Sequence, residues 1–358
     1  MKVIVNGRFL SRRPAGVDRF AVEVLAAIDG LADSADSQTE GLEFCVLVPP
    51  GKAPSAKFSR IQTQVVGTRN GQLWEQMDLP KAAGENFLIN LCNTGPMLRR
   101  RQLTVIHDAA TVRVPESYSR SFRTWYGFLL PKLYRRSHSV CTVSEFSRTE
   151  LNSIYGKRHD VCVLSEGTEH MARVASDATV LERHNLLERP FVLAVSSLSP
   201  HKNFGAVVEA VSLLGDAGFD VAIAGGQNPK IFAGAGLPPS VKYVGYVTDE
   251  ELKALYEHAS CFVFPSIYEG YGLPPTEAMA CGCPVLAARA ASIPEVCRDA
   301  AEYFDPNSPA ELAALLSRVM SDAELRARLS AKGRTRAQEL RWEDAARKLV
   351  KEIRRVCA

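Results

Sequence analysis

Residues 265–282 read PSIYEGYGLPPTEAMACG and directly follow the short apolar run CFVF at 261–264. The apolar run predicts a buried strand, and the two prolines at 274–275 favour the first turn of a helix. Between them, Gly270 and Gly272 allow the main chain to approach a ligand closely. A glycine-rich turn that leads into a helix N-terminus is a typical anion site, because main-chain N–H groups there attract phosphate.

Two carboxylates, Glu269 and Glu277, flank this turn and can point into one pocket from two sides. Carboxylates accept hydrogen bonds from vicinal hydroxyls, so a sugar or a ribose is a natural ligand. Taken alone, each residue is as easily an exposed loop acid or a helix N-cap acid. Their combination with two glycines and two prolines favours a binding site.

The alternation of short apolar runs and amphipathic stretches extends along the whole chain of 358 residues. This pattern predicts an α/β fold with parallel sheets, whose ligands bind at the carboxyl ends of strands. A single core rarely exceeds about 250–300 residues, which favours two domains. We place the link in the polar stretch 172–185 and expect domains at 1–178 and 179–340, with a C-terminal helix at 341–358 that crosses back to the first domain.

Composition and charge argue against several other classes of protein. Hydrophobic residues make up 46% and charged residues 23% of the chain, and the net charge of +3 is too small for general nucleic-acid binding. No apolar run approaches the ~20 residues that span a bilayer. The nine cysteines lack zinc-site spacing and no secretory signal is evident. We therefore expect reduced thiols, no metal, no cofactor and a cytoplasmic location.

Basic residues concentrate in the first half of the chain. The first 178 residues carry 23 Lys and Arg against 18 Asp and Glu, whereas the remainder carries 20 against 22. The run RRR at 99–101 and the aromatic and basic segment 119–136 both lie in this half. The ordinary interpretations are a solvated turn and a core helix with a charged face. The functional alternative is peripheral attachment to an anionic membrane surface, on its inner face.

The segment 265–282 resembles the E-x7-E signature of retaining glycosyltransferase family 4. That family has the GT-B fold, in which two Rossmann-like domains face each other across a cleft. The resemblance covers nearly the whole chain. The other stretches that resemble the family are AGVDR at 15–19, HD at 107–108, VSEFSR at 143–148, SLSPHKN at 197–203, VGYV at 244–247, DEEL at 249–252, SIPEV at 292–296 and FDP at 304–306.

The resemblance implies roles for residues of the second domain. Glu277 would hold the ribose hydroxyls of a nucleotide-sugar donor, and Glu269 would contact the transferred sugar. Lys202 would neutralise the leaving pyrophosphate. Many members carry an arginine about five residues before this lysine, where this chain has Ser197, so His201 is a candidate to share the charge. The other donor contacts implied are those of the main chain at Tyr271, Gly272 and Leu273 with sugar and phosphate, and of the segment that ends at Val247 with the nucleobase.

In the first domain, the resemblance implies that Gly16 and Val17 border the distal phosphate and the acceptor. It also implies that His107 lies by the anomeric carbon and an outer hydroxyl of the sugar. Taken alone, a histidine at the end of a strand is often a hydrogen-bonded core residue.

We therefore predict a metal-independent retaining hexosyltransferase whose second domain binds the donor and whose first domain binds the acceptor. The stretches SLSPHKN and EGTEH, the latter at 166–170, resemble a mannosyltransferase-like branch. This branch implies GDP-mannose as the donor and a glycan or lipid-linked saccharide as the acceptor, in surface polysaccharide assembly. UDP-sugar donors remain open.

A sugar-nucleotide epimerase on the same fold and a non-catalytic two-domain sugar-binding protein remain as alternatives. A nicotinamide dehydrogenase needs G-x-G-x-x-G after its first strand, whereas this chain has NGRFLSRRPAG at 6–16.

Overall fold

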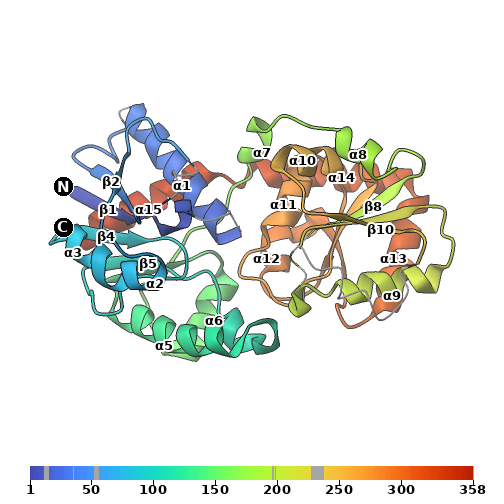
Figure 1. Cartoon of the computed structure of the whole chain (residues 1–358). Helices are drawn as coiled ribbons and strands as arrows, with labels where there is room; N and C mark the ends of the chain where they lie inside the picture. Colours follow the sequence, from blue (N-terminus) through green and yellow to red (C-terminus); the bar gives the residue numbers. More distant parts are fainter. Residues whose placement is uncertain are drawn as a thin grey trace. The chain divides into compact units, whose positions relative to one another are not determined.

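The computed structural model describes residues 1–11, 16–34, 36–51, 56–195, 197, 199–226 and 238–357. The chain divides into two compact units, and Figure 1 labels many of their helices and strands. Unit 1 comprises Met1–Gly167 and Arg341–Ala358, and unit 2 comprises Thr168–Leu340. The division falls earlier than the expected boundary at 178. Thr168 already packs with unit 2, because its hydroxyl donates to the carbonyl oxygen of Ala337 at 3.0 Å.

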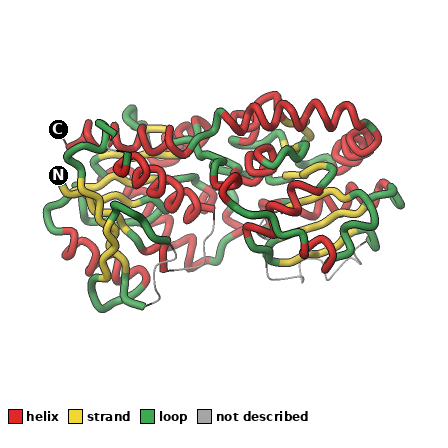
Figure 2. Tube along the Cα trace, turned by 90° about the horizontal axis from the view of Figure 1, so that it is seen from above, coloured by secondary structure: helices red, strands yellow, loops and turns green. Residues whose placement is uncertain are grey.

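Unit 1 is built on a seven-stranded parallel sheet in the order β3-β2-β1-β4-β5-β6-β7. The central strands β1 and β4 are mostly apolar and almost wholly buried, because helices cover both faces of a parallel sheet (Figure 2). The edge strand β3 has the polar sequence QTQV and is exposed along its length. The strands are β1 (Lys2–Asn6), β2 (Glu43–Val48), β3 (Gln62–Val65), β4 (Phe87–Asn90), β5 (Gln102–Val105), β6 (Ser139–Thr142) and β7 (Cys162–Val163).

The C-terminal helix packs in unit 1, where Trp342 is buried and its ring centroid lies 5.9 Å from that of Phe20 on α1. Ser144 caps α6 by accepting a hydrogen bond from Ser147 N at 3.0 Å, as its position before an amphipathic run predicts. The helices are α1 (Gly16–Asp33), α2 (Gly71–Leu73), α3 (Leu79–Ala83), α4 (Ala110–Arg113), α5 (Arg120–Arg136), α6 (Glu145–Tyr155) and α15 (Trp342–Cys357), with a π-helix at Trp74–Asp78 and 3-10 turns at Arg8–Ser11 and Pro115–Ser117.

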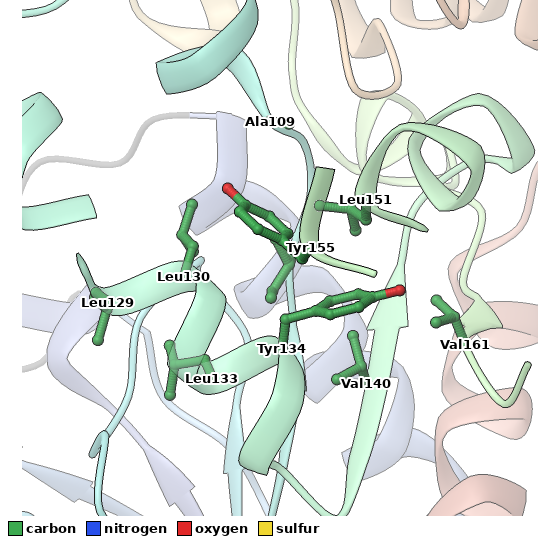
Figure 3. Packing of buried hydrophobic residues seen from close by; sticks show 10 residues of the cluster. Ala109, Leu129, Leu130, Leu133, Tyr134, Val140, Leu151, Tyr155 and Val161 are labelled. Carbon is green, nitrogen blue, oxygen red and sulfur yellow. The ribbon is translucent and has the colours of Figure 1, made fainter. Parts of the chain in front are cut away.

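Helix α5 has two different halves. Its C-terminal half packs into the core of unit 1 through Leu129, Leu130, Leu133 and Tyr134 (Figure 3). The hydroxyl of Tyr134 donates to Asn152 on α6 at 2.9 Å. The N-terminal half contributes no buried residue. Trp125 and Tyr126 of this half are partly buried and pack against the same core cluster. The interpretation of 119–136 as a core helix with a charged face therefore fits the second half best.

Unit 2 repeats the same plan with six parallel strands in the order β10-β9-β8-β11-β12-β13. Its strands are β8 (Phe191–Val195), β9 (Asp220–Ala224), β10 (Val241–Gly245), β11 (Cys261–Phe264), β12 (Val285–Ala288) and β13 (Ala301–Phe304). Its helices are α7 (His170–Arg173), α8 (Thr179–Arg183), α9 (Phe204–Leu214), α10 (Asp249–His258), α11 (Leu273–Ala280), α12 (Ile293–Cys297), α13 (Pro309–Ser321) and α14 (Ala323–Gln338), with 3-10 turns at Pro200–Lys202 and Arg298–Ala300.

In each unit the first strand lies inside the sheet. Successive strands are added on one side of it, and the later strands are then added on its other side, so that the chain order reverses. The reversal falls between β1 and β4 in unit 1 and between β8 and β11 in unit 2. Ligands of doubly wound sheets bind at such switch points, outside the carboxyl ends of the strands. Among the residues that the structure describes, no helix is both long and apolar enough to cross a bilayer.

Candidate active site

The loops that follow β8 and β11 meet at the switch point of unit 2. The N–H of Ile267 donates to the carbonyl oxygen of His201 at 2.9 Å. The side-chain amide of Asn203 donates to the carbonyl oxygens of Pro265 at 3.2 Å and Pro306 at 2.8 Å. These bonds hold the SLSPHKN loop against the segment that carries the E-x7-E residues.

The ammonium group of Lys202 lies 2.7 Å from Glu269 Oε1. The two side chains are 17% and 13% exposed, so both are largely withdrawn from solvent but still accessible. Sequence reasoning assigned both residues to the donor site, and the structure brings them together. It did not foresee the ion pair itself, because 67 residues separate the two positions in the chain.

Gly272 is the residue that turns the chain from the loop into α11. Its φ of +96° lies in the left-handed region, which strains any residue with a side chain. The hydroxyl of Ser292 lies 2.9 Å from the carbonyl oxygen of Glu269 and 2.8 Å from that of Tyr271. Ser292 thereby fixes the turn, and Leu273 then begins the eight-residue helix with prolines in its first turn.

Glu277 lies one turn into α11 and is buried, with 7% of its surface exposed. Its Oε1 lies 2.9 Å from His170 Nε2, and the hydroxyl of Tyr256 donates to Oε2 at 3.4 Å. Burial, followed by the negative charge of Glu277, raises the pKa of Tyr256 well above its usual range. His170 lies in the EGTEH stretch, but no spacing rule connects it to a carboxylate 107 residues later.

The remaining predicted donor-side residues lie in the loops that follow β8 and β10. Val247 is half-buried just after β10. On β10, the hydroxyl of Tyr243 lies 3.0 Å from the carbonyl oxygen of Gly225. Ser197 is exposed and its hydroxyl donates to Ser199 at 3.3 Å, while its neighbours at 196 and 198 lie outside the described residues. His201 is 6% exposed, within the 3-10 turn that also contains Lys202.

In unit 1, His107 follows β5 and is buried, with 4% of its surface exposed. The ring Nε2 of His107 lies 2.8 Å from the carbonyl oxygen of Leu91, and the main-chain N–H of His107 donates to Asn93 Oδ1 at 2.6 Å. The ring packs edge-on against Phe20 with centroids 4.8 Å apart, and Nδ1 lies 3.9 Å from Glu166 Oε1. These partners fix the orientation of the imidazole. Sequence reasoning did not assign Glu166 to this role.

A cavity of about 450 Å³ opens near His107 in unit 1. Val17, from the first turn of α1, lines it together with Asp108, the residue after His107. Gly16 begins α1 and is exposed, and a Cβ added there would meet no atom within 4 Å. Two of the predicted acceptor-side positions, 17 and 107, therefore lie at or beside one cavity. Residues 12–15, which include Ala15 of the AGVDR stretch, lie outside the described residues.

Comparisons with known proteins bear directly on this arrangement. Residues 177–336 match the family described as "Glycosyl transferases group 1". The O-antigen chain mannosyltransferase B of Escherichia coli is 29% identical over 280 residues, which cover 73% of this chain and 70% of the relative. The O-antigen chain mannosyltransferase RfbU of Salmonella typhimurium is 26% identical over 321 residues, which cover 85% of this chain and 87% of the relative.

Among solved structures, Anabaena Alr3699/HepE in complex with UDP and glucose has a similar fold, with a TM-score of 0.72 and 17% identity. The match covers 99% of this chain and 100% of that chain. Two Rossmann-like units with parallel sheets are the architecture of GT-B glycosyltransferases, so the expected fold class is confirmed. The family match and the mannosyltransferase relatives agree with this fold. The chain is therefore a mannosyltransferase-like glycosyltransferase, an enzyme that transfers a hexose.

Proposed function

We propose that this enzyme transfers mannose from GDP-mannose, with retention at the anomeric carbon, to a glycan or lipid-linked saccharide in surface polysaccharide assembly. The observation that carries the proposal is the Lys202–Glu269 pair, 2.7 Å apart at the switch point of unit 2 and beside the N-terminus of α11. A cation and a helix N-terminus suit a diphosphate, and a carboxylate suits sugar hydroxyls. Mannose is favoured because both curated relatives described above are named as mannosyltransferases.

The residues have distinct tasks in this reaction. As the bond between the anomeric carbon and the diphosphate oxygen breaks, the acceptor hydroxyl attacks on the same face and its proton passes to the departing diphosphate. Lys202 stabilises the negative charge that develops on the leaving group, with the N–H groups at Tyr271, Gly272 and Leu273. Glu269 orients the transferred sugar and Glu277 the ribose.

On the acceptor side, the reacting groups are bordered by Gly16, Val17 and His107. On the donor side, Val247 and its neighbours contact the nucleobase. Ser197 and His201 complete the loop around Lys202.

A donor panel tests this function. The purified chain is incubated with GDP-mannose, UDP-glucose or UDP-galactose and an oligomannoside acceptor, and the product is analysed by NMR. We expect transfer from GDP-mannose with an α linkage. Inversion would contradict the retaining mechanism, and transfer from a UDP-sugar only would establish the alternative donor class. Donor turnover to an epimer without any acceptor would favour the epimerase alternative, and binding without turnover would favour the non-catalytic one.

Transfer should not depend on a divalent metal. The chain has no Asp-x-Asp pair of the kind that holds a metal on a donor diphosphate. Lys202 and the N-terminus of α11 are expected to neutralise the diphosphate instead. Activity in excess EDTA should therefore equal activity in magnesium. Loss of turnover in EDTA with recovery on adding magnesium or manganese would contradict this prediction.

Peripheral attachment to an anionic membrane is the second part of the proposal. Exposed basic residues lie at the amino ends of two neighbouring strands of unit 1: Arg100 and Arg101 before β5, and Arg135 and Arg136 before β6. The N–H of His138 donates to the carbonyl oxygen of Arg100 at 3.0 Å and so joins the two turns. Such an edge attracts anionic lipids without insertion.

Only part of the RRR run can serve this attachment. The Arg99 guanidinium is committed to the fold, because it donates to the carbonyl oxygens of Gly84 at 2.8 Å and Arg101 at 3.2 Å. Arg100→Ser with Arg101→Ser should weaken capture by anionic vesicles about tenfold or more, at ~1 kcal/mol for each residue. The matched control is Arg318→Ser with Arg328→Ser, two exposed arginines of unit 2. Vesicle co-sedimentation at low salt measures the effect, and equal loss in both double variants would contradict it.

A further inference from the structure

Ser292 lies just before α12 but does not cap that helix. A serine in this position normally accepts a hydrogen bond from a main-chain N–H of the first turn, whereas the Ser292 side chain makes no such bond. Its hydroxyl lies instead 2.9 Å from the carbonyl oxygen of Glu269 and 2.8 Å from that of Tyr271. The hydroxyl of Ser292 therefore serves the turn before α11, which is more than 20 residues away in the chain.

The main chain around Ser292 holds this side chain in place. Ser292 and the following Ile293 are both wholly buried. A Cβ atom added at Gly272 would lie 3.9 Å from the Ile293 side chain, so this segment packs against the turn. The preceding Ala291 has a φ of +52°. This left-handed conformation costs free energy in a residue with a side chain, and it persists only where the surrounding structure requires it.

The turn presents two main-chain N–H groups that the described structure leaves without an acceptor. Counted from the N-cap, the first four N–H groups of a helix have no partner within the helix. In α11 the prolines at 274–275 remove two of these four donors, and those of Gly272 and Leu273 remain. Among the described residues neither N–H has a hydrogen-bond acceptor, and no side chain caps the helix. Both donors are thus suited to an anionic oxygen.

Ser292 sets the direction of the first of these donors. The carbonyl oxygen of Tyr271 and the N–H of Gly272 belong to one peptide group, and in a trans peptide they point in opposite directions. Because the buried Ser292 hydroxyl holds the carbonyl oxygen, the Gly272 N–H is fixed on the opposite side of the turn. We propose that Ser292 is a positioning residue that aims the Gly272 N–H at the diphosphate of the nucleotide-sugar donor.

This inference rests on the proposed function and adds to it a residue that acts through the main chain of the turn. The diphosphate gains negative charge as the glycosidic bond breaks. A donor whose direction is already fixed stabilises that charge without any rearrangement. Loss of the Ser292 hydroxyl frees the peptide group between Tyr271 and Gly272 to rotate, so the contribution of this N–H to binding and to the transition state should decrease.

Ser292→Ala tests the proposal, because it removes the hydroxyl without adding volume. We expect its affinity for GDP to fall about three- to tenfold, the range for one hydrogen bond, and its affinity for guanosine to stay unchanged. Inorganic pyrophosphate, a probe without base or ribose, should show the same loss as GDP. The kcat of transfer should fall about tenfold. Titration calorimetry measures GDP and pyrophosphate, and saturation-transfer NMR measures guanosine.

The matched control is Ser330→Ala, at the other end of the same helix. Ser330 on α14 is half-buried, and its hydroxyl donates to the carbonyl oxygen of Gly282, just after α11, at 2.7 Å. Each variant loses one hydroxyl that holds a main-chain carbonyl oxygen in unit 2, so thermal unfolding should show comparable losses of stability. Ser330→Ala should keep the GDP affinity and the kcat of the unaltered protein.

Unchanged affinity of Ser292→Ala for both GDP and pyrophosphate would overturn the proposal. An equal loss of guanosine and GDP affinity would also overturn it, because that result means damage to unit 2 as a whole. Failure of the proposed donor is a separate result. If the unaltered protein binds UDP but not GDP, the donor assignment is wrong, and the comparison of UDP with uridine then tests Ser292 in the same way.

Discussion

Lys202→Ala should lower the kcat of mannosyl transfer by about a hundredfold and leave the KM for the donor nearly unchanged. The leaving diphosphate gains negative charge as the glycosidic bond breaks, so its cation contributes most in the transition state. Removing one group that stabilises such charge typically costs a factor of about 10²–10³ in kcat. Steady-state kinetics with GDP-mannose and a fixed saturating acceptor measure the effect. A raised KM with unchanged kcat would show instead that Lys202 binds ground state and transition state equally.

The structure provides two controls for this experiment. Lys242→Ala removes another lysine of unit 2 that is ion-paired at 2.7 Å, with Asp220, and it should leave kcat unchanged. Glu269→Gln keeps the shape of the partner of Lys202 but removes its charge, and it should slow transfer through the lost orientation of the sugar. If Lys242→Ala and Lys202→Ala had equal effects, the loss would reflect the stability of unit 2 and not the reaction.

Glu277→Ala should weaken the binding of GDP by about 10- to 150-fold. A lost hydrogen bond to a charged group is worth about 1.5–3 kcal/mol, which corresponds to this range. Titration calorimetry with GDP measures the affinity without any contribution from the transferred sugar. Unchanged affinity would remove the ribose assignment of Glu277.

Burial of Glu277 makes a second variant necessary. The alanine substitution leaves His170 without the carboxylate that lies 2.9 Å from its Nε2, so a thermal unfolding curve must accompany the calorimetry. Glu277→Gln keeps an oxygen for His170 and a similar volume, and it should fold normally while binding GDP more weakly. Tyr256→Phe removes only the longer contact of 3.4 Å and should change the affinity little.

The fold could be predicted from the sequence because its signals are local. Continuous apolar runs such as 261–264 predict buried parallel strands, and amphipathic runs between them predict the covering helices. The turn around Gly272 could also be predicted from the sequence. The strand, the glycines, the prolines and the two glutamates all lie within about 20 consecutive residues. A motif of this length fixes its own geometry through φ preferences and helix capping.

The partners of the site residues were decided only by the tertiary structure. Lys202 meets Glu269 across 67 residues, and His170 meets Glu277 across 107. Glu352 on α15 accepts a hydrogen bond from Ser139 across 213 residues. No periodicity or spacing in the sequence encodes such pairs, because each is set by which strands become neighbours at the switch point or which helix covers them.

Helix α5 shows the same limit most clearly. Phe122 and Leu129 are both apolar residues on one amphipathic helix, yet Phe122 lines a cavity and Leu129 is fully buried. The sequence by itself determined that this stretch is a helix with apolar and basic residues. The tertiary structure decided that its first half lines a cavity and its second half fills the core. The physical reason is that burial depends on what packs against a helix face, and neighbours distant in the chain supply that packing.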